Sequence, residues 1–305
     1  YWPLMGKNDT DKLAFAEPLD DGRVGETCHP RFQTASYRCR HHIPSADAVI
    51  IRPNTQIFPI MRQTVFIADL HLSDDTPDLN RLFFQALKDW QGKVDALYIL
   101  GDLFEVWLGD DMPDHAAVQV AEALRDFSAH APVYFICGNR DFLLGAHYAA
   151  AAGMILLPEV QTLNLYGRHC LISHGDEMCT DDAAYQRFRR IIRLPWLKKI
   201  LLALPQKWRR KIAADMRAAS KRRKREIGLS PISDVSEYGV QTALKQYPQT
   251  EILIHGHTHR PAVHSHTFGG RTVSRYVLPD WHGKEGGYLS VSERGCTLHG
   301  LPAEK

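Results

Sequence analysis

Five short apolar runs in this chain each end in side chains that can bind a metal ion. Each run is short and apolar enough to form a buried strand, and the polar residues follow within three positions. They are Val65–Ala68 with Asp69 and His71, Ala96–Leu100 with Asp102, Val133–Cys137 with Asn139, Cys170–Ser173 with His174, and Glu251–Ile254 with His255 and His257. In α/β sheets, ligand sites form outside the carboxyl ends of the strands. The pattern therefore restricts the chain to folds in which these run ends meet.

Amphipathic segments with helical spacing separate the apolar runs. They are Leu79–Trp90, His115–Phe127 and His147–Ala152. Alternating strands and helices predict an α/β core with a central sheet. After His264 the pattern changes to extended segments at Thr272–Leu278 and Gly287–Val291. We expect these to close the fold as a second sheet or a β-rich edge.

The first part of the chain differs from the rest. Residues 1–63 carry turn formers and scattered charges without sustained periodicity, which predicts an irregular or disordered extension. Met61 stands directly before the first strong run, so we hypothesise that translation starts there. The folded domain is then expected at residues 64–301.

A long insertion is expected between two strands of this domain. Residues 181–228 are compatible with helix almost throughout and predict a helical cap. The cap combines apolar residues, at Trp196, Leu197, Ile200, Leu201, Leu202 and Leu204, with cations at Arg189, Arg190, Lys198, Lys199, Arg209, Arg210 and Lys211. Such a surface suits an anionic membrane. The alternative is that the leucines pack on the core and the basic face is solvated.

Composition narrows the class of protein. The formal net charge is only +2, so charge alone does not make the chain a polyanion binder, and we expect no nucleic acid as partner. The six cysteines show no CxxC spacing and predict idle thiols in a reducing compartment. The sequence has neither the pattern of a signal peptide nor an apolar run long enough to cross a bilayer. These features predict a cytosolic protein that touches a membrane without spanning it.

The chemistry of the polar residues predicts two metal ions. Asp69 and His71 are two apart on extended backbone, so both point to the same side, and the same holds for His255 and His257. Carboxylate, amide and imidazole ligands suit manganese, iron or zinc. Seven ligands are too many for one ion, and Asp102 is the expected bridge. Two ions about 3.5–4 Å apart can clamp phosphoryl oxygens during an in-line displacement.

These residues resemble the calcineurin-like metallophosphoesterase family. The family pattern reads here as Asp69-Leu70-His71, Gly101-Asp102, Gly138-Asn139-Arg140-Asp141, His174-Gly175 and His255-Gly256-His257. Longer strings, from Ile67–Leu72 to His255–His264, resemble its UDP-2,3-diacylglucosamine diphosphatase branch. The resemblance covers about residues 61–301. It implies a four-layer αββα sandwich with an inserted helical cap.

The resemblance also implies a reaction and a ligand scheme. Water would cleave the pyrophosphate of a UDP-diacylglucosamine lipid in lipid A biosynthesis, at the cytoplasmic face of the bacterial inner membrane. Mn²⁺ is the implied metal. One ion would be held by Asp69, His71, Asp102 and His257, and the other by Asp102, Asn139, His174 and His255. Asn139, Arg140 and His174 are the implied catalytic residues.

Substrate contacts are implied at Asn139, Arg140, Asp182, Ser220, Lys224, Ile227 and His255. At Lys224 and Ile227 the family has an asparagine and a lysine, so the sequence departs from its pattern there. Arg140 would stabilise phosphoryl charge as a planar cation; the alternative is an ion pair with Asp141. Two other functions stay open. One is hydrolysis of another nucleotide or dinucleotide, and the other is a scaffold that has lost catalysis.

Overall fold

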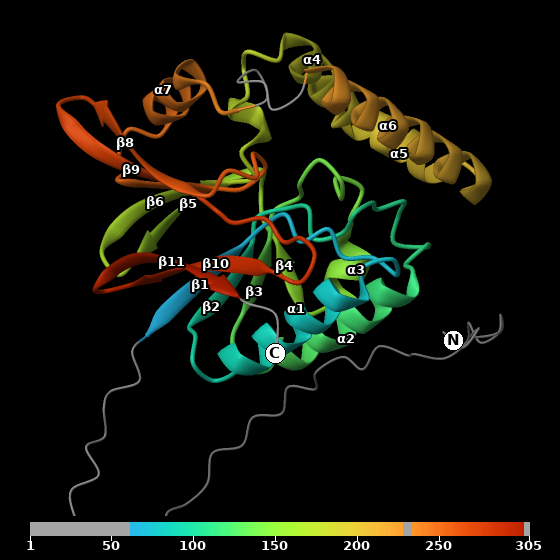
Figure 1. Ribbon diagram of the computed structural model, residues 1–305, viewed down its shortest axis with the longest axis horizontal. Helices are drawn as coiled ribbons and strands as arrows, with labels where there is room; N and C mark the ends of the chain where they lie inside the picture. The colour runs from blue at the N-terminus through green and yellow to red at the C-terminus, as the bar shows by residue number, and fades with distance from the viewer. Residues whose placement is uncertain (1–61, 228–233, 302–305) are drawn as a thin grey trace, which may run out of the picture. The chain divides into compact units, whose positions relative to one another are not determined.

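Two β-sheets form the centre of the structure (Figure 1). The computed structural model describes residues 62–227 and 234–301. Met61 and all but the last two residues of the predicted extension lie outside these ranges. The first sheet contains β1 (Gln63–Ile67), β2 (Ala96–Ile99), β3 (Val133–Phe135), β4 (Met154–Leu156), β10 (Gly286–Ser292) and β11 (Gly295–Leu301). Its order is β11-β10-β1-β2-β3-β4, and β1 to β4 run parallel to one another.

The second sheet has five strands. They are β5 (Val160–Leu165), β6 (Arg168–Ser173), β7 (Ile252–His255), β8 (Ala262–Phe268) and β9 (Arg271–Val277). The order is β5-β6-β7-β9-β8, in which β6, β7 and β9 are parallel. The strands expected after His264 therefore divide between the sheets, because β9 joins the second sheet and β10 joins the first.

Strand β1 shows how the apolar runs are buried on both faces. Val65 and Ile67 face one cluster, which contains the helices, whereas Phe66 faces the cluster shared by the two sheets. The ring of Phe66 stacks on Tyr98 of β2 with 4.9 Å between centroids. A strand covered on both faces needs apolar residues at every position, and this explains the unbroken apolar run.

Helices cover the outer face of each sheet. In the first sheet's outer layer lie α1 (Pro77–Trp90), α2 (His115–Ser128) and α3 (Ala146–Ala151). The outer face of the second sheet is covered by α7 (Glu237–Gln246), whose Val240 and Leu244 pack against Leu171 and Leu253. The layers are therefore helix, sheet, sheet and helix, and the predicted four-layer αββα fold is confirmed.

Local sequence sets where the helices begin. Pro77 occupies the first turn of α1, where its missing amide hydrogen costs nothing. The side chain of Asp114 caps α2 by accepting a hydrogen bond from the Ala117 amide at 2.8 Å. Ser236 caps α7 in the same way through the Gly239 amide, at 3.0 Å.

Three helices occupy the stretch predicted as a cap, namely α4 (Ala183–Ile192), α5 (Pro195–Ala203) and α6 (Gln206–Ile227). In Figure 1 they lie beside one another at one end of the folded part of the chain. Neither α4 nor α5 has a buried residue. Arg209 on α6 is buried, forms an ion pair with Asp111, and donates to the Leu108 and Leu204 carbonyl oxygens. Polar contacts therefore contribute much of the attachment of the cap.

No disulfide joins the cysteines within the described residues. They are Cys137, Cys170, Cys179 and Cys296. Burial raises the pKa of Cys137 and of Cys170 to about 12, so both stay protonated at neutral pH. These four thiols agree with the predicted absence of a disulfide framework; Cys28 and Cys39 lie outside the described residues.

Substitution of Phe66 by alanine tests the packing between the sheets. Phe66 is fully buried, so Phe66→Ala should lower the free energy of unfolding by about 3–5 kcal/mol through lost contacts and a cavity. Val118→Ala, at an exposed position of α2, is the control and should change the free energy of unfolding by less than about 0.5 kcal/mol. Urea denaturation measures both. Similar losses in the two variants would contradict the packing described here.

Candidate metal centre

The predicted ligands lie where the parallel strands of both sheets end. Short backbone hydrogen bonds join the turns that carry them. The Asp69 amide donates to the Gly101 carbonyl oxygen at 3.1 Å, and the Gly256 amide donates to the His174 carbonyl oxygen at 3.0 Å. Turns from distant parts of the sequence are thus fixed against one another at a single edge.

The backbone at these turns is strained. At these turns positive φ angles occur at five described residues that are not glycine, Asp69 (55°), His71 (52°), Asp102 (53°), His257 (69°) and His259 (53°). A side chain at positive φ costs energy, and such residues persist only where the surrounding structure enforces them. Their concentration at one edge indicates that this geometry serves a function.

Close approach of two turns depends on glycine. A Cβ atom on Gly138 would lie 2.1 Å from Oδ1 of Asp102, and one on Gly101 would lie 2.6 Å from the Gly138 Cα atom. Any side chain at either position would separate Asp102 from Asn139. The two glycines therefore allow carboxylate and amide ligands to share one site.

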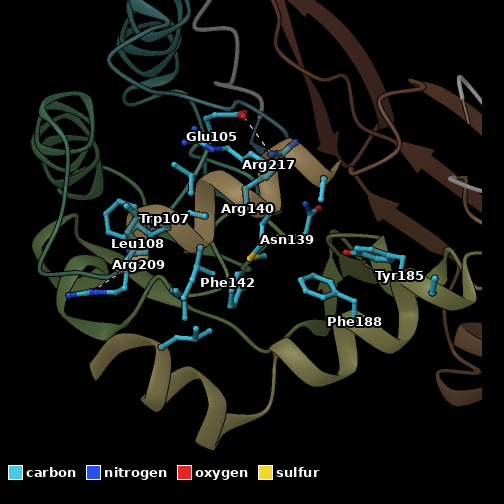
Figure 2. Close-up of a pocket in the computed structure, with 18 residues that line it drawn as sticks. Glu105, Trp107, Leu108, Asn139, Arg140, Phe142, Tyr185, Phe188, Arg209 and Arg217 are labelled. Carbon is cyan, nitrogen blue, oxygen red and sulfur yellow. Dashed lines mark hydrogen bonds and ion pairs between the residues drawn. The ribbon is translucent and has the colours of Figure 1, made fainter. Parts of the chain in front are cut away.

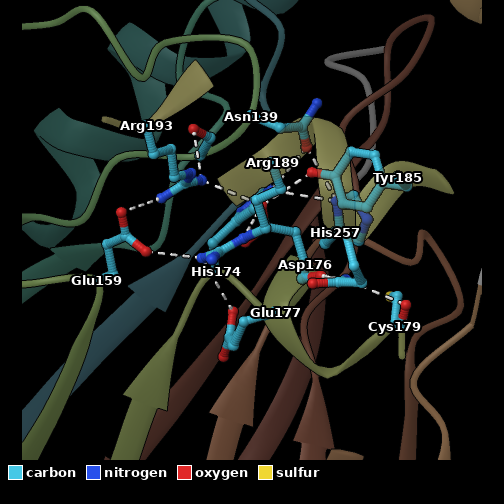
Figure 3. Close-up of polar contacts among 12 residues, drawn as sticks. Asn139, Glu159, His174, Asp176, Glu177, Cys179, Tyr185, Arg189, Arg193 and His257 are labelled. Atoms are coloured by element: carbon cyan, nitrogen blue, oxygen red, sulfur yellow. Dashed lines mark hydrogen bonds and ion pairs between the residues drawn. The ribbon is translucent and has the colours of Figure 1, made fainter. Parts of the chain in front are cut away.

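One group of polar atoms gathers around Asn139. Its Oδ1 lies 3.0 Å from Nε2 of His174 and 3.0 Å from Nδ1 of His257. These two ring nitrogens are 3.2 Å apart, and Oδ1 of Asp102 is 3.8 Å from Nε2 of His174. Figure 3 shows Asn139, His174 and His257 pointing toward one another. An oxygen and two nitrogens that converge in this way can coordinate a divalent ion.

A neighbouring group consists of Asp69, His71 and His259. Their ligand atoms all lie within 4.8 Å of one another, as do those of Asp69, Asp102 and His174. Asp69 thus belongs to the set with His71 and His259 and also to the set with Asp102 and His174. Asp102, the expected bridge, belongs only to the second of these sets. Oδ1 of Asp69 is buried and has no hydrogen-bond partner among the described residues. A buried carboxylate oxygen without a donor is well suited to a cation, so these residues fit a divalent metal site.

The expected ligand His255 ends β7 and is fully buried. Its Nδ1 lies 2.9 Å from the Gly256 carbonyl oxygen, its Nε2 accepts from Arg275 at 3.1 Å, and burial lowers its pKa to about 4. His259, which the sequence did not single out, places Nε2 3.5 Å from Oδ1 of Asp69 and Nδ1 3.2 Å from Oδ2 of Asp280. Burial opposes protonation of His259, but Asp280 and Asp69 raise its pKa to about 10. The assignment of His255 and His257 as the ligand pair stays a prediction.

Burial and charge shift the pKa values at this edge. Burial together with the charge of Asp69 raises the pKa of Asp102 to about 6. Burial opposes protonation of His174, but the charges of Asp102 and Asp69 raise its pKa to about 8. Burial and His174 lower the pKa of His257 to about 3, which keeps it neutral as a ligand must be. The carboxylates therefore repel one another and favour a bound cation.

Comparison with known proteins decides the family. Residues 63–261 match the family model described as calcineurin-like phosphoesterase. This chain is a calcineurin-like phosphoesterase. A protein named UDP-2,3-diacylglucosamine hydrolase from Chromobacterium violaceum is 49% identical over 237 residues, which cover 78% of this chain and 97% of that protein. Proteins of the same name from Escherichia coli and Serratia proteamaculans are 50% and 47% identical, each over 78% of this chain and 99% of that protein.

A cavity of about 320 Å³ opens beside the metal centre of this phosphoesterase. Figure 2 shows its walls, which come from the core on one side and the cap on the other. Most of the lining is apolar or aromatic, with Trp107, Phe142, Tyr185, Phe188, Leu201, Ile212 and Met216. Asn139 and Arg140 line it as well, so the cavity borders the metal centre.

The remaining predicted substrate contacts are placed as follows. Arg140 lies at the cavity, with Nη1 3.5 Å from Oε1 of Glu105. Oδ1 of Asp182 caps α4 by accepting from the Tyr185 amide at 2.8 Å. Ser220, Lys224 and Ile227 belong to α6, but their side chains lie outside the described part of the chain. Sequence reasoning missed Glu105 and Tyr185, although Glu105 stands within one of the motif strings.

Metal titration of two histidine variants tests the assignment of His255. His255→Ala should lower the bound metal and reduce turnover, because it removes one of the expected ligands. His259→Gln should keep the full complement of metal, because the His259 ring pairs with Asp280. Elemental analysis of the folded proteins gives the stoichiometry. Loss of metal in His259→Gln alone would replace His255 by His259 in the ligand set.

Proposed function

We propose that this phosphoesterase hydrolyses the pyrophosphate bond of UDP-2,3-diacylglucosamine. The products are UMP and 2,3-diacylglucosamine 1-phosphate, and the step belongs to lipid A biosynthesis. The observation that carries this proposal is the match to relatives named UDP-2,3-diacylglucosamine hydrolase, which share about half of their residues with this chain over nearly their whole length. An intact set of ligand side chains at one edge argues against a scaffold without catalysis.

The ligands divide into two sets in this proposal. Asp69, His71, Asp102 and His257 would hold one divalent ion, and Asp102, Asn139, His174 and His255 would hold the other. Asp102 is the proposed bridge, because it belongs to both sets, and its Oδ1 is oriented by the Arg140 amide at 2.8 Å. Mn²⁺ is the proposed metal. When bound, two such ions supply positive charge that stabilises displacement at phosphorus.

Arg140 binds the reacting phosphoryl group in this scheme. It follows Asn139 directly, and its side chain is 28% exposed, toward the cavity. Glu105 stands between it and the metal ligands, with Oε2 3.6 Å from Nδ1 of His71. A guanidinium held in this way provides planar donors where negative charge increases in the transition state.

The cavity accounts for the lipid part of the substrate. Its aromatic and aliphatic lining suits acyl chains, while Asn139 and Arg140 place its polar end beside the metal centre. An apolar slot that ends at a phosphoryl-binding site matches a molecule with acyl chains on one side of a pyrophosphate. A small soluble dinucleotide would leave most of this lining in contact with water.

The outer face of the cap is the proposed membrane-docking surface. Trp196 and Trp208 are 58% and 61% exposed, and Ile200 is 50% exposed. The exposed cations near them are Arg190, Lys199, Lys207, Arg210 and Lys211. Among the described residues, no helix is long and apolar enough to span a bilayer. We propose peripheral attachment to the cytoplasmic face of the inner membrane.

Two cations that were expected on this surface form ion pairs with carboxylates of the core. Arg189 and Arg209 were both assigned to lipid headgroups from the sequence. Arg189 instead pairs with Asp176 and Glu159, and Arg209 pairs with Asp111. Both hold the cap in place and are removed from the docking surface.

An assay on the diacylated UDP-sugar tests the reaction. The wild-type protein should turn over this lipid in the presence of Mn²⁺ and should leave soluble dinucleotide polyphosphates largely intact. Arg140→Ala should lower kcat by about 10²–10³-fold, the effect of removing one donor to transition-state charge, with metal content unchanged. Arg294→Ala, at an exposed turn, is the matched control. Preference for the dinucleotide would overturn the proposal.

Vesicle binding tests the docking surface. Replacing Lys207, Arg210 and Lys211 by glutamine should weaken binding to anionic vesicles by about 3 kcal/mol, at about 1 kcal/mol for each basic residue near the surface. The control replaces Arg81, Lys88 and Lys93 on and beside α1 and should change binding little. Flotation with phosphatidylglycerol and with pure phosphatidylcholine measures both. Equal binding of the wild-type protein to the two lipids would contradict electrostatic docking.

A further inference from the structure

Asp176 is a buried carboxylate that the proposed mechanism does not use. It begins the short 3-10 helix η1 (Asp176–Met178), two residues after His174, and is fully buried. Its Oδ2 accepts three hydrogen bonds from α4 and the residue that follows it. Tyr185 donates from its hydroxyl at 2.8 Å, Arg189 from Nε at 2.8 Å and Arg193 from Nη2 at 3.1 Å. Figure 3 shows these cap side chains converging on Asp176.

The same arginines reach two further parts of the core. Glu159, which precedes β5, pairs with Nη2 of Arg189 at 2.7 Å and with Nη1 of Arg193 at 2.8 Å. Nη2 of Arg193 also donates to the Gly138 carbonyl oxygen at 3.1 Å. Because Gly138 directly precedes Asn139, one cap residue joins the turns that carry Asn139 and His174.

Tyr185 connects this network to the metal centre and to the cavity. Its ring is stacked on His257 with 6.0 Å between centroids and 24° between planes. Together with Phe188, one turn further along α4, it lines the cavity. The hydroxyl bound to Asp176 therefore fixes an aromatic ring that faces both a ligand and the lipid slot.

Apolar burial does not hold α4 in this position. The helix has no buried residue, and Phe188 and Ile191 are 43% and 55% exposed. Charged contacts attach the helix instead. Arg189 and Arg193 lie against three carboxylates of the core, Asp176, Glu159 and Glu177.

We propose that Asp176 is a positioning residue for the lipid substrate. It fixes α4 against the metal-binding edge, so that Tyr185 and Phe188 keep the wall of the cavity aligned with Arg140 and the ligands. Asp176 touches neither metal nor substrate and acts through the three side chains that it holds. The inference rests on the proposed function for the identity of the lipid, but its geometry is independent of that identity.

The variant Asp176→Asn isolates the charge without changing the size of the side chain. Arg189 and Arg193 keep Glu159 as a partner, so the variant is expected to fold. Loosening α4 removes binding shared by ground and transition states, so KM for the diacylated UDP-sugar should rise about tenfold with kcat nearly unchanged. Turnover of bis(4-nitrophenyl) phosphate, which is too small to need the cap, and metal stoichiometry should both stay at the wild-type level.

Hydrogen exchange supplies a readout that does not depend on the substrate. Amides of α4 should exchange faster in Asp176→Asn, while those of β1 and β2 should be unchanged. Asp126→Asn, at an exposed position of α2, is the matched control and should alter neither measurement. If Asp176→Asn does not fold, Arg189→Gln removes one donor of the three and should produce a smaller change in the same direction.

The outcomes separate this inference from the proposed function. Failure of the wild-type protein on the diacylated UDP-sugar, with faster exchange of α4 in Asp176→Asn, overturns the substrate and supports the positioning role. Equal loss of lipid and small-ester turnover, or loss of metal, overturns the positioning role and assigns Asp176 to the metal centre. The positioning role is also overturned if Asp176→Asn changes neither KM for the diacylated UDP-sugar nor the hydrogen exchange of the α4 amides.

Discussion

Burial of three carboxylates at one sheet edge constrains the structure around it. Asp69, Asp102 and Asp141 are nearly or fully inaccessible to solvent. Each accepts a backbone hydrogen bond, from the amides of His257, Arg140 and Gly138 respectively. These bonds do not remove the repulsion among the carboxylates, because burial and neighbouring carboxylates raise the pKa of Asp102 to about 6 and that of Asp141 to about 7. Binding of cations and stability of the folded edge are therefore coupled.

Much of the fold and the position of the site follow from local sequence, because the signals are strong and short in range. A strand buried on both faces requires an unbroken apolar run, and the turns after such runs carry the ligands. Strands β4 and β5 were not anticipated, since Met154–Leu156 is very short and Val160–Leu165 is only partly buried. His259 was not singled out, because only the turn after β7 brings it close to Asp69.

Contacts made by the cap could not be derived from its sequence. Arg189 and Arg209 look like surface cations on an amphipathic helix, and helical periodicity does not reveal a buried partner far away in the chain. Asp176 stands beside His174 in the motif, yet its role depends on side chains that α4 and the turn after it bring to it. Networks of this kind form only when tertiary structure brings distant residues together. The helix propensity and periodicity of these residues do not reveal them.

The cap is attached by polar contacts at two separate places. Asp176 and Glu159 hold the end of α4, and Asp111 holds α6 near its start through Arg209. A rigid body fixed at two points keeps one rotational freedom, about the line that joins them. Rotation about that line is therefore the motion of the cap that these contacts restrain least.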